Sequence, residues 1–281
     1  MPVAAPEFDY VEGESSTNIP FDPAGDLIVV EATVNGKGPF RFLLDTGASH
    51  NVMTPELAQS LGLKVEGGGV IDSGGRATVS AGRACVAEVR VGGFALARQS
   101  FFVTTFPASY PFQGFLGAEL FKRFTVRIDF RRSLLTLTAP DAFRYRGGGV
   151  VLPLKFHGGL IPQVRAEVDG HAGWFKLDTG YNGSLALFGK FIDEHDLLTK
   201  YGPREGRGGA RTLTGELTNV PAARVREFKL SGLMLGRVDA SFFLEREGSN
   251  SIFAGAIGTG ILKQFEVVVD YERRRIILES R

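Results

Sequence analysis

The stretch that decides the fold is Phe42-Leu43-Leu44-Asp45-Thr46-Gly47-Ala48-Ser49, and a near copy follows as Phe175-Lys176-Leu177-Asp178-Thr179-Gly180-Tyr181-Asn182. In each copy an apolar run, typical of a buried strand, leads into Asp-Thr-Gly. The glycine permits a tight backbone turn directly after the carboxylate, because no Cβ stands in the way. The sequence therefore predicts two strand-to-turn elements, each carrying one aspartate at its end.

The surroundings of the motif are duplicated as well. Leu116-Gly117 follows the first copy and Ile257-Gly258 follows the second, and the same spacing separates these glycines from Asp129 and Asp270. A tandem duplication with one Asp-Thr-Gly carboxylate per half accounts for this pattern. Asp129 and Asp270 lack the glycine turn, so we expect them to be structural.

Strand signals dominate both halves. β-branched segments are separated by the turn dipeptides Asn35-Gly36 and Asp169-Gly170. Short helices are predicted at 54–62 and 188–197. The sequence therefore predicts an all-β chain of two pseudo-symmetric lobes with a few short helices and a site at the lobe interface. The expected divisions are a lead-in over 1–24, an N-terminal lobe over 25–138, an inter-lobe connection over 139–153 and a C-terminal lobe over 154–281.

Composition limits the classes of function. The 281 residues are 43% hydrophobic, enough for two modest cores, and 32 basic residues balance 31 acidic ones. That balance argues against nucleic acid or a membrane surface as the main partner. No apolar run approaches the roughly 20 residues that a bilayer span needs. The single cysteine, Cys85, excludes an internal disulfide and is expected to be a small core residue.

Neither a metal site nor a cofactor is expected. A metal or phosphate enzyme is poorly supported, because the sequence offers no phosphate-binding loop and its histidines lack metal-ligand spacing. His50 lies close to Asp45 in sequence, and we expect it at the surface, with an influence on the site as the alternative. The four histidines are His50, His157, His171 and His195.

The first half resembles a known family. Asn35-Gly36, then Asp45-Thr46-Gly47-Ala48-Ser49, then a helix ending in Ser60-Leu61-Gly62-Leu63 is very similar to the N-terminal pattern of the pepsin/retropepsin-like aspartic proteases, above all their bacterial single-chain members. The resemblance covers roughly residues 18 to 280. It implies two acid-protease-like β lobes whose Asp-Thr-Gly loops meet at a two-fold axis. Leu116-Gly117 and Ile257-Gly258 resemble the strands that thread beside each loop.

The resemblance implies an aspartic endopeptidase with Asp45 and Asp178 as the catalytic pair. In this family two adjoining carboxylates cannot both ionise cheaply, so they share one proton. The ionised member would take a proton from water, and the protonated member would bind the scissile carbonyl. The sequence does not decide which aspartate plays which role. An extended peptide or protein would be the substrate, and a monomer would suffice, because both carboxylates lie on one chain.

Other residues are expected to support the two loops or to cover the site. By the resemblance, Thr46 and Thr179 brace the loops against each other through buried hydrogen bonds. The remaining loop-support residues are Gly47, Ser49 and Gly180. Two glycine-rich segments at similar distances from the two aspartates predict hairpins that could act as flaps, with plain surface hairpins as the alternative. The flap candidates are Gly74, Gly75, Gly208 and Gly209.

The second loop departs from the family pattern. Tyr181-Asn182-Gly183 stands where the family usually has a small residue followed by Ser or Thr. This departure favours the alternative function, a catalytically silent peptide-binding or inhibitory module on the same fold. Such a module would bind a peptide that stays intact on long incubation.

The N-terminal residues bear on location. Met1-Pro2-Val3-Ala4-Ala5-Pro6 lacks the apolar core of a signal peptide. The sequence leaves open whether a signal, propeptide or anchor was removed. We expect a periplasmic or secreted protein, with a cytoplasmic location as the alternative.

Overall fold

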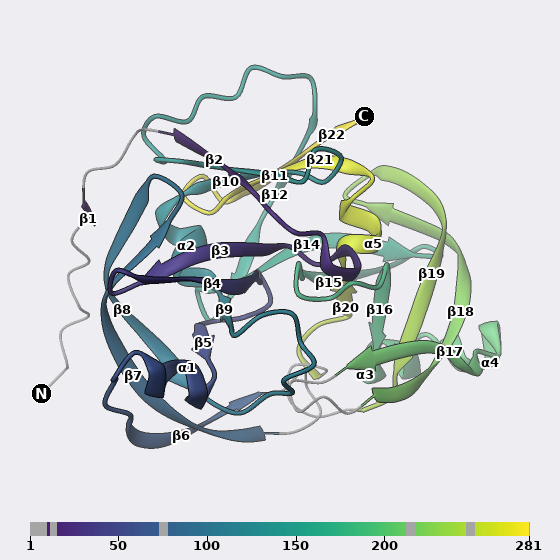
Figure 1. Cartoon of the computed structure of the whole chain (residues 1–281). Helices are drawn as coiled ribbons and strands as arrows, with labels where there is room; N and C mark the ends of the chain where they lie inside the picture. Colours follow the sequence, from purple (N-terminus) through teal and green to yellow (C-terminus); the bar gives the residue numbers. More distant parts are fainter. Residues whose placement is uncertain (1–9, 12–15, 73–77, 212–216, 246–250, 281) are drawn as a thin grey trace, which may run out of the picture.

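The structure is a computed structural model that describes residues 10–11, 16–72, 78–211, 217–245 and 251–280. These residues form three β sheets with a few short helices packed around them, arranged as two lobes side by side (Figure 1). The expected all-β, two-lobed architecture is confirmed. The helices are η1 (Ala24–Asp26), α1 (Pro55–Ser60), α2 (Ala118–Arg123), α3 (Gly189–Glu194), α4 (Leu197–Tyr201) and α5 (Thr259–Leu262).

The first lobe is built on an eight-stranded sheet. Its β7 pairs with both β3 and β8, so the sheet curls back on itself. Inside it, β4 runs parallel to β9, and β5 is antiparallel to β9. In spatial order the strands are β1 (Tyr10–Val11), β8 (Phe94–Val103), β5 (Asn51–Met53), β9 (Gly114–Leu116), β4 (Lys37–Leu44), β3 (Val29–Val34), β7 (Thr78–Val91) and β6 (Glu66–Asp72).

The second lobe repeats this topology. Its β18 pairs with both β14 and β19, β15 runs parallel to β20, and β16 is antiparallel to β20. The duplication read from the sequence is therefore a duplication of strand pairing. In spatial order the strands are β13 (Lys155–His157), β14 (Ile161–Val168), β15 (His171–Leu177), β20 (Gly255–Ile257), β16 (Leu185–Phe188), β19 (Leu233–Phe243), β18 (Leu217–Leu230) and β17 (Arg204–Arg211).

A six-stranded sheet joins the two lobes and lies along the top of Figure 1. At its centre the equivalent strands of the two halves pair antiparallel, with Val126 opposite Val269 and Ile128 opposite Val267. This pairing relates the halves by a pseudo-two-fold axis. In spatial order the strands are β12 (Val150–Pro153), β22 (Arg275–Ser280), β21 (Phe265–Asp270), β10 (Thr125–Asp129), β11 (Leu134–Thr138) and β2 (Ser16–Pro20).

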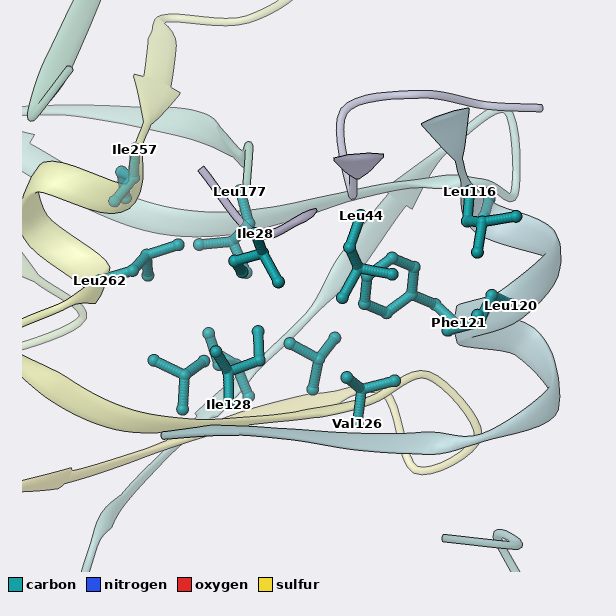
Figure 2. Packing of buried hydrophobic residues seen from close by; sticks show 14 of the residues in the cluster. Ile28, Leu44, Leu116, Leu120, Phe121, Val126, Ile128, Leu177, Ile257 and Leu262 are labelled. Atoms are coloured by element: carbon teal, nitrogen blue, oxygen red, sulfur yellow. The ribbon is translucent and has the colours of Figure 1, made fainter. Parts of the chain in front are cut away.

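The main core fills the space between this sheet and the ends of the two motif strands. Leu44 and Leu177, each directly before an aspartate, are 0% and 1% exposed. Figure 2 shows both side chains on the same side of the core, facing Val126 and Ile128 of β10. Burial of side chains this size stabilises the fold by about 1.5–3 kcal/mol each. The backbone at both aspartates is thus anchored from below by apolar packing.

Local signals read from the sequence produce the expected turns and first helix. Asn35 and Gly36 have φ of 50° and 72°, the left-handed values that a tight hairpin between β3 and β4 requires. Asp169 and Gly170 adopt the same conformation, with φ of 50° and 82°. The hydroxyl of Thr54 accepts a hydrogen bond from the N–H of Leu57 and caps α1.

Some expectations need correction. Cys85 is exposed, because the alternation of β7 buries Ala84 and Val86 and turns the residue between them outward. The single helix expected at 188–197 is two helices, α3 and α4, with Asp196 at a φ of 47° before the second.

The proposed lead-in includes β2, which pairs with β11, and the proposed connection ends in β12, which pairs with β22. The division into lobes at the stated residues stays a prediction.

The duplicated aspartates at the ends of β10 and β21 hold the turns that follow them. Asp270 is fully buried and accepts hydrogen bonds from the N–H of Arg273 and from Nε of Arg275. Asp129 accepts from the N–H groups of Arg131 and Arg132. Both residues have the structural role that the sequence predicts.

Asp270→Asn should lower the free energy of unfolding by roughly 3 kcal/mol, because it removes one partner of a buried ion pair with Arg275. Asp129→Asn is the matched control and should cost about 1 kcal/mol or less, since its nearest cation, Arg132, is 3.8 Å away and largely exposed. Urea denaturation of both variants measures the difference. Equal losses would contradict the structural distinction between the two aspartates.

Candidate active site

The two Asp-Thr-Gly loops are built by matching backbone hydrogen bonds. The N–H of Asp45 donates to the carbonyl of Leu116, and the N–H of Asp178 donates to the carbonyl of Ile257, both at 3.0 Å. These bonds continue the parallel pairing of β4 with β9 and of β15 with β20. Each aspartate therefore sits at the end of a strand held from the side by its neighbour.

Thr46 and Thr179 lock the loops together. The hydroxyl of Thr46 donates to the carbonyl of Leu177 at 2.9 Å, and the hydroxyl of Thr179 donates to the carbonyl of Leu44 at 2.7 Å. Each hydroxyl also accepts from the other threonine's N–H, at 3.0 Å in both directions. Both residues are at most 1% exposed, so every one of these bonds is shielded from water. The expected brace is present.

The two glycines bring each loop against the carboxylate of the other lobe. A Cβ on Gly47 would lie 2.6 Å from Oδ1 of Asp178, and a Cβ on Gly180 would lie 2.5 Å from Cγ of Asp45. The N–H of each glycine donates to the aspartate of its own loop, to Oδ1 of Asp45 at 2.7 Å and to Oδ1 of Asp178 at 3.1 Å. Only glycine fits at these two positions, so the motif places both carboxyl groups at one point between the lobes.

The Asp45 carboxyl is electrostatically perturbed. Its pKa is raised from 3.8 to about 7, chiefly by loss of hydration and then by the neighbouring charge of Asp178 and a side-chain hydrogen bond with Asp178. The cation of Lys176 and the N–H of Gly47 act in the opposite direction. A carboxyl group held in this way keeps its proton up to near neutral pH. Such a pair can hold one proton between two carboxyl groups, the arrangement that general acid–base catalysis needs.

Sequence reasoning missed Lys176. Its ammonium group lies 2.9 Å from Oδ2 of Asp178, and the two side chains are only 11% and 13% exposed. A signal was available, because a lysine two positions before the aspartate on an apolar strand points to the same face as the aspartate. The equivalent residue of the first half is Leu43, so this cation has no counterpart there.

The unusual Tyr181-Asn182-Gly183 segment preserves the loop. The N–H of Tyr181 donates to the carbonyl of Asp178, and the carbonyl of Tyr181 accepts from the N–H of Thr259. Ala48 makes the same two bonds in the first loop, to Asp45 and from Ala118. The departure therefore changes the side chains and leaves the loop's backbone pattern intact.

The side chains of that segment pack rather than intrude. The Tyr181 ring lies edge-on to Phe243, and burial raises the pKa of its phenol. Gly183 lies so close under the Tyr181 ring that a Cβ there would be 2.2 Å from it. Asn182 donates from Nδ2 to the carbonyl of Gly25 in the other lobe, at 3.1 Å. The three residues form a packed corner at the lobe interface.

The other predicted residues have mixed outcomes. Ser49 is partly exposed, and no hydrogen bond joins its side chain to either aspartate in the described part of the chain. Gly208 and Gly209 lie in β17, opposite Val220 and Asn219 of β18. Gly74 and Gly75 lie outside the described residues. Both hairpins are present at their bases, as β6–β7 and β17–β18, and their role as flaps stays a prediction.

A large cavity of about 1170 Å³ lies in the first lobe beside an aromatic cluster. Neither aspartate lines it. Its wall includes Phe106 and Phe112, which belong to a small apolar cluster together with Leu43, two residues before Asp45. Phe106 and Phe112 each lie 5.3 Å from Phe115, ring to ring. This cavity is a candidate binding site for apolar side chains in the first lobe.

Other kinds of site find little support. Among the residues that the structure describes, no group of three or more His, Cys, Asp or Glu side chains could hold a metal ion. His50 is 45% exposed and contacts Glu119 at 2.9 Å, as expected for a surface histidine. Within the same described ranges, no helix has the length and apolar character needed to cross a bilayer.

Comparison with known proteins agrees with the geometry. Residues 30–120, which include the first Asp-Thr-Gly loop, match a family model described as aspartyl protease. The match covers about a third of the chain and includes Asp45. A crystal structure of an aspartic proteinase from Irpex lacteus has the same fold, with a TM-score of 0.63 and 12% identity over 94% of this chain and 97% of that one. No curated protein sequence matches the chain.

Thr46→Val should lower the free energy of unfolding of the protein by about 2–4 kcal/mol, because it leaves the carbonyl of Leu177 and the N–H of Thr179 buried without partners. Thr125→Val is the matched control. Its hydroxyl is buried with no hydrogen-bond partner among the described residues, so its removal should be close to neutral. Urea denaturation of the two variants measures the contrast, and similar losses would contradict the role of the threonine lock.

Asp45 also predicts a pH dependence of stability. Its folded pKa of about 7 lies above the ordinary value of 3.8, so the folded state binds this proton more tightly than the unfolded state. Stability should therefore fall as pH rises from about 4 to about 7. Asp45→Asn removes this loss, so the variant should gain stability relative to wild type across that range and keep the gain above it. A constant difference between pH 4 and 8 in urea denaturation would contradict the raised pKa.

Proposed function

We propose that the protein is an aspartic endopeptidase that hydrolyses peptide bonds with water activated between Asp45 and Asp178. The observation that carries the proposal is the side-chain hydrogen bond between Asp45 and Asp178, each of which accepts from the glycine N–H of its own loop and lies against the glycine of the other loop. The raised pKa of Asp45 supports it, because one proton can then stay on the pair at mildly acidic and near-neutral pH.

The chemistry needs one proton on the pair. A water molecule attacks the scissile carbonyl carbon while the ionised aspartate takes one of its protons, and the protonated aspartate gives its proton to the carbonyl oxygen. The resulting tetrahedral diol collapses as the C–N bond breaks. The first aspartate then gives its proton to the leaving nitrogen, and the second regains its own from the diol. The pair ends with one proton, as it began, and no covalent adduct with the enzyme forms.

An extended peptide is the proposed substrate. A strand-like peptide can bind across a site between two β lobes through main-chain hydrogen bonds, with pockets for alternate side chains. The aromatic cavity beside Leu43 supports an apolar side chain at one of these positions. Both carboxylates lie on one chain, so we propose that a monomer acts. A periplasmic or secreted location stays a prediction.

The alternative, a silent peptide-binding or inhibitory module, depended on the departure at Tyr181-Asn182. That segment makes the same backbone hydrogen bonds as Ala48 in the first loop. Its tyrosine packs toward Phe243 rather than displacing the pair. These contacts favour the peptidase over the silent module.

Asp45→Asn and Asp178→Asn should each lower kcat/KM for an unfolded protein substrate by at least about 100-fold, because either change removes one half of the acid–base pair. Wild-type activity should fall as pH rises through about 7, where Asp45 loses its proton. Cleavage is measured between pH 3 and 8 by gel electrophoresis and mass spectrometry of the fragments.

Asp129→Asn is the control, since it changes an aspartate outside the motif that holds only its own turn. It should cleave at the wild-type rate. Retention of activity in either motif variant would contradict the proposed mechanism. A wild type that binds peptides and leaves them intact would favour the silent module.

A further inference from the structure

A buried cation contacts one member of the aspartate pair and has no equivalent at the other. We propose that Lys176 is a positioning residue that keeps Asp178 as the ionised carboxylate and leaves the shared proton on Asp45. The proposal rests on the proposed peptidase function and deepens it, since it assigns the base and the acid. Asp178 would take the proton from the attacking water, and Asp45 would bind and protonate the carbonyl oxygen.

Lys176 lies in buried, apolar surroundings, so its contact with Asp178 is not an incidental ion pair on the surface. Residue 176 pairs with Ala256 across β15 and β20, and its ammonium group lies 5.8 Å from the centre of the Phe188 ring. Ala256 and Phe188 belong to a small apolar cluster of the second lobe. Its counterpart in the first lobe contains Leu43, the residue equivalent to Lys176. A charge placed where the other half has leucine is costly unless it is paired.

The pairing that offsets this cost is specific to one carboxylate. Nζ of Lys176 lies 2.9 Å from Oδ2 of Asp178, and the opposite oxygen, Oδ1, accepts from the N–H of Gly180. Asp178 thus contacts the positively charged ammonium group of Lys176 and accepts a hydrogen bond from the N–H of Gly180. Asp45 accepts from the N–H of Gly47 and has a side-chain hydrogen bond with Asp178, and Lys176 acts on it at longer range. The ionised form is therefore favoured more at Asp178 than at Asp45.

Other titratable groups around the pair do not reverse this order. Tyr181 is buried near Asp178, and its phenol has a raised pKa, so it stays neutral. Tyr271 lies on the Asp45 side, and burial together with the charges of Asp45 and Glu119 raises its pKa as well. Among the groups described as acting on either carboxyl, Lys176 is the one cation. Lys176 is thus the charged side chain that distinguishes the surroundings of Asp178 from those of Asp45.

Carboxyl NMR on protein labelled with ¹³C at the aspartate carboxyl groups tests the proposal without any need for cleavage. At pH 5.5 the wild type should show Asp45 at the chemical shift of a protonated carboxyl and Asp178 at that of a carboxylate. The signals are assigned by their loss in Asp45→Asn and Asp178→Asn. The reverse order, or two equal intermediate shifts, in the wild type would overturn the proposal even if no Lys176 variant folds.

Two variants test the cause. Lys176→Met removes the charge and should bring the two carboxyl shifts toward each other, while Lys176→Arg keeps the charge and should preserve the wild-type order. A Lys176→Met spectrum identical to that of wild type would overturn the assignment of this role to Lys176.

Activity gives an independent readout. Because Lys176 lowers the pKa of Asp45, its removal should move the alkaline limb of the kcat/KM profile to higher pH, and Lys176→Arg should leave that limb in place. If the alkaline limb of the Lys176→Met profile lies at the same pH as that of wild type, that result would also contradict the proposal. If wild type and variants all fail to cleave, the peptidase function fails, and the NMR spectra still decide the role of Lys176.

Discussion

Thr46 and Thr179 exchange buried hydrogen bonds that hold the two Asp-Thr-Gly loops together. Each hydroxyl donates to the carbonyl of the residue just before the opposite aspartate, Leu177 or Leu44. Those two leucines are anchored in the core above the six-stranded sheet (Figure 2). The threonine lock therefore connects the two Asp-Thr-Gly loops to the packed core of the protein. It holds together two carboxyl groups that would otherwise repel each other.

The duplicated sequence gives the two loops the same arrangement, but the two copies are not identical. The loops share their backbone bonds, their glycine contacts and their threonine lock. They differ at three positions, which are Leu43 against Lys176, Ala48 against Tyr181 and Ser49 against Asn182. The first difference adds a buried charge on one side of the pair, and the second fills a corner of the lobe interface. Symmetry positions the carboxyl groups, and these departures give them unlike surroundings.

The sequence was sufficient for the features that depend on local signals or on the repeat itself. The two motif turns, the Asn35-Gly36 hairpin, the cap at Thr54 and the pairing of the halves all follow from residue types at fixed spacings. It was insufficient where partners come from elsewhere in the chain. Pairing of β2 with β11 and the contact of Lys176 with Asp178 depend on tertiary packing. Cys85 was placed wrongly because the alternation of β7 decides its exposure.

In the proposed mechanism, Asp45 and Asp178 act together on one tetrahedral carbon. This joint action is tested most directly by a crystal structure with a peptide in which a secondary hydroxyl group replaces the scissile carbonyl, since that group mimics the tetrahedral intermediate. We expect the hydroxyl to lie between the two carboxyl groups, within hydrogen-bond distance of both. A peptide bound elsewhere on the protein, or a hydroxyl that contacts neither aspartate, would contradict it.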